Sequence, residues 1–242
     1  MGRKGKMVEN EINSSYLNEK MIITWYLPEA FTPLSSYHVC IMQDGKDYFQ
    51  LGKIATLSDQ LHGDGEIDNT VFVGIHYRDR YDRYEKYHPN GAQNSAYIQF
   101  LIRELVPFLD GELPTYQVGG SRALMGDSLA GTLALMTATK YPNTFGKVIM
   151  QSPYVNQTVL DAVRSAGNLD AISFYHSIGT LETAVNTTND GELNFINPNR
   201  ELNEAFQQKQ SDYIYREFDG DHTWKYWQRE LPDVLKMMFG WD

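Results

Sequence analysis

Cysteine is almost absent from this sequence of 242 residues, which contains only Cys40. An intramolecular disulfide is therefore excluded, and so is a cluster of thiolate metal ligands. Cys40 lies in the apolar run 39–42, where we expect a buried and inert thiol. The sequence also lacks a His-x-x-x-His pair, a calcium-loop spacing and a glycine-rich phosphate-binding motif, so no metal and no cofactor is predicted.

Basic residues are fewer than acidic ones. The 21 Lys and Arg residues are outnumbered by 31 Asp and Glu residues, which gives a formal net charge of -10. A field of this sign repels phosphate groups, so nucleic acid and anionic membranes are not expected partners. A small or neutral substrate fits the charge better, and nothing in the sequence indicates an oligomeric state.

Targeting segments and linkers are missing too. No apolar run of signal-peptide length follows the basic start, and Lys6 stands where a myristoylation motif needs Ser or Thr, so we expect a soluble, cytoplasmic protein. No repeat and no Pro/Gly/Ser-rich linker divides the chain. The sequence therefore predicts a single domain over residues 1–242, with residues 1–20 as an N-terminal extension.

Apolar runs of strand length alternate with helix-like patterns in the second half of the chain. Strands are expected at Met21–Leu27, His38–Met42, Thr70–Ile75, Arg122–Met125, Lys147–Met150, Ile172–Ser177 and Tyr213–Phe218, and helices at Ser95–Leu109 (capped by Ser95), Leu129–Thr139, Glu201–Gln208 and Thr223–Phe239. This order predicts an α/β fold with a mostly parallel central sheet, helices on both faces and an antiparallel start. In such sheets the chemistry collects at the carboxyl ends of the strands.

Ser128 lies in the segment GDSLAG (126–131), between an expected strand and an expected helix. This context is typical of a nucleophile elbow, in which small neighbours let strand and helix approach closely. Gly126, Ala130 and Gly131 meet that need, although the usual motif has Gly where Ala130 stands. The alternative is an ordinary strand-to-helix turn with a capping serine.

The base and the acid of such a site follow the serine in the order acid, then histidine. His222 lies between the last strand and the last helix, whereas His176 falls inside a strand and is expected to be a packed histidine. Glu182, on the loop after the strand Ile172–Ser177, is the predicted acid. Asp190, further along the same loop, remains an alternative, and a surface role for Glu182 stays open.

Four segments together resemble the esterase D-like and enterochelin-esterase-like group of α/β-hydrolases. They are IMQDGK (41–46), ELVP (104–107), GDSLAG (126–131) and GDHTW (220–224) with Trp227 behind it. The resemblance implies an α/β-hydrolase fold and a serine esterase with a small-molecule ester substrate. It also implies an oxyanion hole made by the backbone N–H groups of Lys46 and Leu129.

Two other interpretations remain at this point. The string GDSL with Asp219 and His222 matches the GDSL hydrolases, but these carry the serine after their first strand. A hydrolase-fold protein that binds a ligand without turnover is the other possibility, since a fold does not fix a function.

The aromatic and basic run 76–88 follows a strand and is expected near the mouth of the site. Arg78, Arg80, Arg83 and Tyr84, together with Trp224, are therefore candidate substrate-binding residues, with stacking and charge pairing as their contribution. The alternative is a surface loop in which Arg and Asp simply pair with each other.

Overall fold

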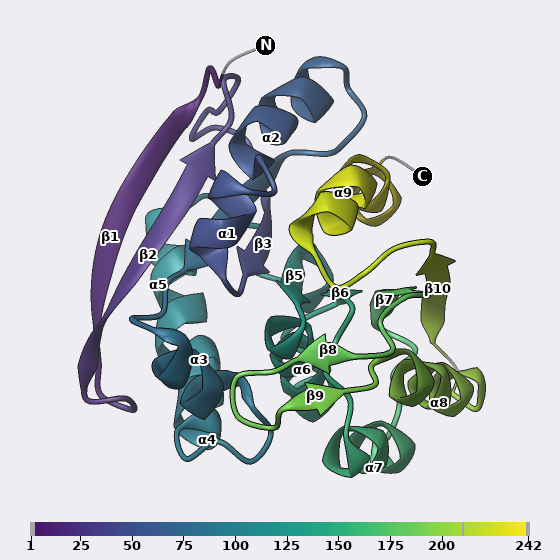
Figure 1. The fold of residues 1–242 in the computed structure, drawn as a ribbon. Helices are drawn as coiled ribbons and strands as arrows, with labels where there is room; N and C mark the ends of the chain where they lie inside the picture. Colours follow the sequence, from purple (N-terminus) through teal and green to yellow (C-terminus); the bar gives the residue numbers. More distant parts are fainter. Residues whose placement is uncertain (1–2, 210, 241–242) are drawn as a thin grey trace.

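One eight-stranded sheet forms the centre of the molecule in the computed structural model, which describes residues 3–209 and 211–240. The strand order across the sheet is β1-β2-β4-β3-β5-β6-β7-β10 (Figure 1). The bounds are Lys6–Ser14 (β1), Glu19–Leu27 (β2), His38–Met42 (β3), Thr70–Ile75 (β4), Arg122–Asp127 (β5), Lys147–Gln151 (β6), Ser173–Gly179 (β7) and Asp212–Phe218 (β10). From β4 to β10 all neighbours are parallel, whereas β1 pairs antiparallel with β2 and β2 with β4. The predicted α/β fold with a mostly parallel sheet is confirmed.

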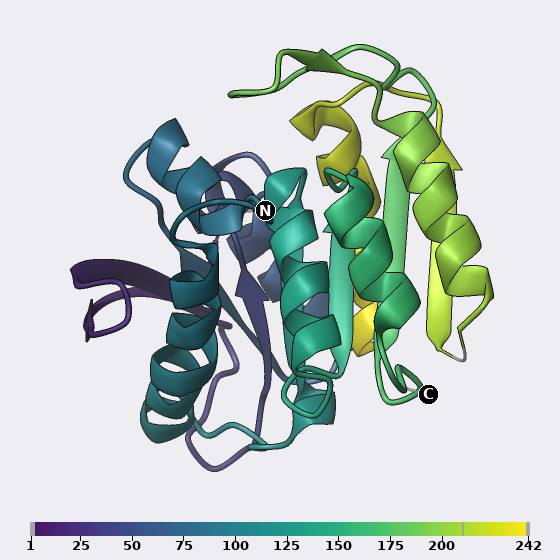
Figure 2. The same cartoon turned by 90° about the horizontal axis from the view of Figure 1, so that it is seen from below.

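Helices cover both faces of this sheet, as Figures 1 and 2 show. One face carries Gly45–Gln50 (α1), Ile54–Gly63 (α2) and Trp224–Phe239 (α9). The other carries Arg80–Tyr87 (α3), Asn94–Phe100 (α4), Val106–Glu112 (α5), Leu129–Lys140 (α6), Gln157–Ser165 (α7) and Ile196–Gln207 (α8). A small hairpin of Val185–Asn186 (β8) and Glu192–Leu193 (β9) stands apart from the main sheet.

The alternation of side chains along the central strands supplies both apolar layers. In β3, Val39 and Ile41 belong to the core on one face, and Cys40 and Met42 belong to the core on the other. Successive residues of a strand point to opposite faces, so a strand covered on both sides must be apolar throughout. This explains why uninterrupted runs predicted the central strands so closely, and Cys40 is fully buried as expected.

The N-terminal part of the sheet differs from the sequence-based picture. Residues 1–20, treated as an extension, contain β1, which pairs with β2 along its whole length. From Glu9 to Asn13, β1 alternates exposed polar and partly buried residues at the edge of the sheet, so it lacks the apolar run of a central strand. The two early strands β2 and β3 are not neighbours, because β4 lies between them.

The helix expected at Ser95–Leu109 is interrupted by a π-helical turn, η1 (Leu101–Leu105), between α4 and α5. Pro107 stands near the start of α5, where its ring would clash with the carbonyl four residues earlier in a regular helix. In the wider turn the Val106 N–H bonds to the Leu101 carbonyl instead. The expected cap at Ser95 is wrong, because α4 begins at Asn94 and has Gln93 at its N-cap.

No helix in the described residues is both long enough and apolar enough to cross a membrane.

Candidate active site

Ser128 stands at the turn from β5 into α6 in a strained backbone conformation. Its φ of 52° and ψ of -126° are unusual for a residue with a side chain. Such a conformation costs about 1–3 kcal/mol, which the surrounding bonds must offset. The Ser128 N–H donates to the Gln151 carbonyl at 2.9 Å, and the Ser128 carbonyl accepts from the Thr132 N–H at 3.1 Å. These bonds hold the serine at the carboxyl end of the sheet.

Gly126 makes this sharp turn possible. A Cβ added to Gly126 would lie 2.3 Å from the carbonyl carbon of Ala130, so no larger residue fits without moving α6. Ala130 itself is fully buried in the contact between strand and helix. The small residues noted in the sequence are therefore needed where β5 meets α6.

His222 lies after β10, just before α9, and its imidazole faces a carboxylate. Nδ1 of His222 is 2.6 Å from Oε2 of Glu182. An ionised carboxylate can only accept, so this contact places the proton on Nδ1 and leaves Nε2 free to accept another. Phe195 and Trp227 pack edge-on against the ring, with centroid distances of 4.7 and 4.8 Å.

Glu182 is itself held by a network that the sequence did not indicate. Its Oε1 accepts from the Ser152 hydroxyl at 2.6 Å and from the Gly179 N–H at 2.8 Å. Ser152 in turn accepts from the indole N–H of Trp227 at 3.0 Å. Glu182 is 1% exposed, so these bonds replace the water that an ionised carboxylate would otherwise need.

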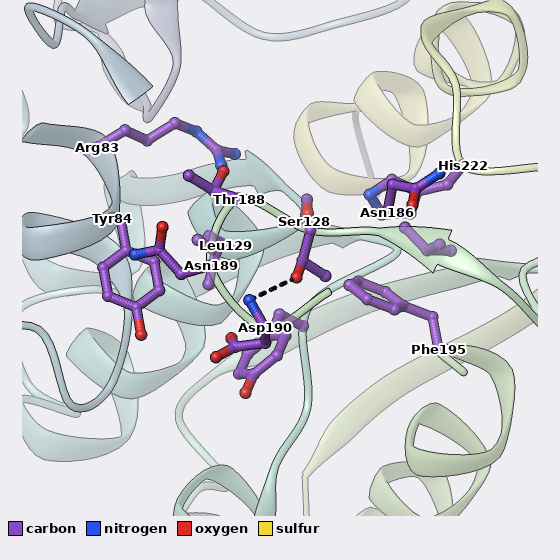
Figure 3. A pocket seen from close by; sticks show the side chains of 13 residues that line it. Arg83, Tyr84, Ser128, Leu129, Asn186, Thr188, Asn189, Asp190, Phe195 and His222 are labelled. Atoms are coloured by element: carbon purple, nitrogen blue, oxygen red, sulfur yellow. Dashed lines mark hydrogen bonds between the residues drawn. The ribbon is translucent and has the colours of Figure 1, made fainter. Parts of the chain in front are cut away.

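Ser128 and His222 line one cavity of about 100 Å³ (Figure 3). Leu129 and Phe195 border the same space, and Arg83 and Tyr84 lie on its far side from His222. No hydrogen bond joins the Ser128 hydroxyl to His222 among the residues that the structure describes. Hydrogen bonds of this kind are often long in unliganded sites and tighten when substrate binds.

A polar segment, residues 186–190, crosses this cavity from the His222 side to the Tyr84 side (Figure 3). Its turn is closed by the Asp190 N–H, which donates to the Thr187 hydroxyl at 3.0 Å. Asp190 then approaches His88 at 3.8 Å. The alternative acid is thus directed toward His88, while the imidazole of His222 pairs with Glu182.

Asp219, the acid of the GDSL alternative, is an exposed residue after β10. Ser128 follows β5, whereas that alternative needs the serine after the first strand. The GDSL interpretation is therefore wrong at the level of the fold.

The candidate substrate-binding residues separate into two groups. Arg83 and Tyr84 line the cavity of Ser128, and they belong to α3 rather than to a loop.

The other candidates lie elsewhere. Arg78 is 67% exposed and pairs with Asp82, as the alternative of mutual pairing predicts. Arg80 lies over the Tyr81 ring. Trp224 packs against Tyr48 and Trp227. The structure does not bring Arg78, Arg80 or Trp224 to this cavity.

The two expected oxyanion donors lie at the starts of two helices. Leu129 is the first residue of α6 and lines the cavity. Lys46 lies in the first turn of α1, and its side chain lines a separate cavity with His76 and Tyr77. The first N–H groups of a helix have no partner within it, so both positions offer main-chain donors.

No group of three or more His, Cys, Asp or Glu side chains suited to a metal occurs in the described ranges.

Asp127, which precedes the nucleophile, is a buried carboxyl with an unusual environment. Its Oδ1 has no hydrogen-bond partner within the described part of the chain. Burial, together with repulsion from Asp44, raises the pKa of Asp127 well above its ordinary range. The protonated, neutral acid is therefore the form that the fold favours.

The pKa of Asp127 is higher in the folded than in the unfolded protein, so the carboxyl of Asp127 loses its proton more easily on unfolding. Its contribution to the free energy of unfolding is therefore largest below the unfolded-state pKa and is lost as pH rises toward the folded-state pKa. Asparagine has the same shape and stays neutral. We expect Asp127→Asn and the wild type to unfold at similar temperatures near pH 4. At about pH 8 the variant should unfold at a higher temperature than the wild type, and at this size each ~1 kcal/mol corresponds to ~2–4 °C. Thermal unfolding at both pH values checks this, with the exposed Asp233→Asn as control; an equal or lower melting temperature at pH 8 would contradict it.

The family model described as "Putative esterase" matches residues 14–238. The chain belongs to this esterase family. The resemblance inferred from the sequence motifs is thereby confirmed, and membership supports hydrolysis of ester bonds as the activity.

Within this esterase family, the chain is 48% identical over 236 residues to the uncharacterized protein YjcH of Bacillus subtilis (strain 168), with 98% of each chain covered. A solved ferulic acid esterase superposes with a TM-score of 0.80 at 18% identity, covering 98% of both chains. The enterobactin esterase FES of Shigella flexneri gives a TM-score of 0.84 at 16% identity, covering 98% of this chain and 60% of that one. The BES protein of Bacillus cereus gives 0.77 at 18% identity, with 99% and 96% covered. At these identities the superpositions establish the fold.

Proposed function

We propose that this esterase is a serine-dependent carboxylic ester hydrolase of small-molecule esters. Ser128 is the nucleophile, His222 the general base and Glu182 the acid that orients the base. The observation that carries the proposal is the 2.6 Å contact between His222 Nδ1 and Glu182 Oε2. It leaves the other ring nitrogen, Nε2, to accept the serine proton.

The reaction runs in two halves through an acyl-enzyme. His222 Nε2 takes the Ser128 hydroxyl proton as the oxygen attacks the ester carbonyl, and the tetrahedral adduct then expels the alcohol, which receives that proton. Water repeats the sequence on the acyl-serine and releases the carboxylic acid. The buried Glu182 stabilises the imidazolium that forms in each half.

The developing oxyanion is held by the N–H groups of Leu129 and Lys46. Leu129 begins a helix of 12 residues, whose N-terminus carries a partial positive charge toward Ser128. Two such donors stabilise the transition state by several kcal/mol, since the loss of one raises the activation free energy by ~2.7–4 kcal/mol.

A fluorophosphonate probe tests the proposal. The folded wild-type protein should be labelled at Ser128, as peptide mass spectrometry would locate, because the probe needs an activated serine beside a base. The variant Ser165→Ala, which changes an exposed serine on α7, is the matched control and should label as well as wild type. Absence of labelling, or labelling elsewhere, would favour a hydrolase-fold protein that binds its ligand without turnover.

A further inference from the structure

The guanidinium of Arg83 joins two segments that are far apart in the sequence, the loop after β3 and the end of β5. Its Nε donates to both carboxylate oxygens of Asp44, at 3.0 and 2.8 Å, and its Nη2 donates to Asp44 Oδ2 at 2.6 Å. The same Nη2 donates to the main-chain carbonyl of Asp127 at 3.4 Å. Asp44 follows β3, and Asp127 ends β5 beside the nucleophile.

This ion pair is largely shielded from water. The side chains of Arg83 and Asp44 are 16% and 2% exposed. In such surroundings the planar fork of arginine fixes both the distance and the orientation of the carboxylate that it binds. A lysine at the same place would retain the charge and lose the fork.

The loop that Arg83 holds is strained and tightly packed. Asp44 adopts the left-handed conformation, with φ of 57° and ψ of 39°, and its carbonyl accepts from the Asp47 and Tyr48 N–H groups at the start of α1. Such a conformation persists only when the surroundings fix it. Gly45 helps, because a Cβ there would lie 2.3 Å from the Cα of Gly74.

Each of the two residues that Arg83 binds lies two positions before an expected oxyanion donor. Lys46 comes two residues after Asp44, and Leu129 comes two residues after Asp127. We propose that Arg83 is a positioning residue that fixes the separation of these two donors by binding the loop after β3 and the end of β5. The inference rests on the proposed function, since it takes the Lys46 and Leu129 N–H groups as the oxyanion hole. It gives Arg83 a positioning role in addition to the expected one of binding substrate, because its Nε and Nη2 are engaged with Asp44 and Asp127 while the residue also lines the cavity.

Kinetics of Arg83→Lys test the role. Two donors must match one oxyanion, and a misplacement of ~1 Å can cost ~100-fold in rate. We expect kcat for an aryl acetate to fall ~10–100-fold, with KM changed less than ~3-fold, because the loss acts on the transition state. Binding of an aryl trifluoromethyl ketone, whose adduct with Ser128 carries an oxyanion, should weaken in parallel with kcat/KM.

Arg200→Lys is the matched control. Arg200 makes an equally well-formed fork with Glu217, at 2.8 Å for both bonds, between α8 and β10 and outside the residues that line the cavity. This variant should keep the wild-type kcat, KM and inhibitor binding. An equal loss in both variants would mean general destabilisation and would overturn the proposal.

Hydrogen exchange tests, without turnover, whether Arg83 holds the loop after β3. Amides of residues 43–48 should exchange faster in Arg83→Lys than in the wild type and at the wild-type rate in Arg200→Lys. Faster exchange with unchanged kcat would overturn the link to the oxyanion hole. An active wild type with unchanged kcat and exchange in Arg83→Lys would overturn this inference alone. A wild type that neither hydrolyses esters nor reacts with a fluorophosphonate would overturn the proposed function, and this inference with it.

Discussion

Ser128→Ala should abolish ester hydrolysis and leave the fold nearly as stable as before. Loss of the nucleophile of a comparable triad lowers kcat by ~10⁶-fold, which leaves only the weak effect of the oxyanion donors on a water attack. Alanine keeps the Cβ that Ser128 already accommodates at its positive φ, and the main-chain bonds to Gln151 and Thr132 remain. The free energy of unfolding should therefore change by less than ~1 kcal/mol.

Aryl ester turnover and thermal unfolding, measured on the same preparation, check both halves of this expectation. Ser165→Ala again serves as the control, since it removes a hydroxyl from an exposed helix position. Turnover of Ser128→Ala within ~10-fold of the wild type would contradict the assignment of the nucleophile, because loss of the serine lowers kcat by ~10⁶-fold in a comparable triad.

Glu182→Gln should lower kcat by ~10⁴-fold, by analogy with other triads in which the acid becomes an amide. The structure gives the reason. The Ser152 hydroxyl and the Gly179 N–H both donate to Oε1, so they select the amide oxygen of Gln at that position. The amide NH₂ then faces His222 Nδ1 and forces it to accept, which leaves the proton on Nε2, where it blocks uptake of the serine proton.

Two isosteric variants separate this outcome from the alternatives. Asp219→Asn changes an exposed carboxylate, and Asp190→Asn changes one that is directed toward His88, so both should keep kcat within a few-fold of wild type. A large loss of kcat in Asp190→Asn, together with little loss in Glu182→Gln, would assign the acid to Asp190, further along the loop after β7. A crippling Asp219→Asn would contradict the pairing of His222 with Glu182.

The central sheet was accessible from the sequence because its strands are buried on both faces. The bounds of β3 and β4 were predicted to the residue from uninterrupted apolar runs. The helix α3 was missed because its sequence, RYDRYEKY, carries no apolar stripe. It begins where the Asp79 side chain accepts from the N–H groups of Tyr81 and Asp82, and Asp82 pairs with Lys86 one turn later. These are local polar contacts that hydrophobic periodicity does not register.

The candidate site was accessible only in part, for a related reason. The order serine, acid, histidine along the chain singled out Ser128, Glu182 and His222 from three segments that follow different strands. Nothing local to Ser152 links it to a glutamate 30 residues away, and nothing local to Arg83 links it to Asp44. Such partners arise from the packing of loops at the edge of the sheet, which strand and helix patterns do not encode.

The segment 186–190 lies across the cavity of Ser128, so we expect it to affect which esters enter rather than the reaction itself. A cavity of about 100 Å³ is well below the ~300–1,000 Å³ of pockets that enclose a drug-sized ligand. We therefore expect an ester of that size to need a movement of the segment, which for loops typically takes microseconds to milliseconds. Esters with short acyl groups should not need this step. Among the hydrogen bonds of the described residues, none joins the segment to the side chains of His222 or Glu182. We therefore expect substitutions within it to change the range of esters admitted and to leave that pair as it is.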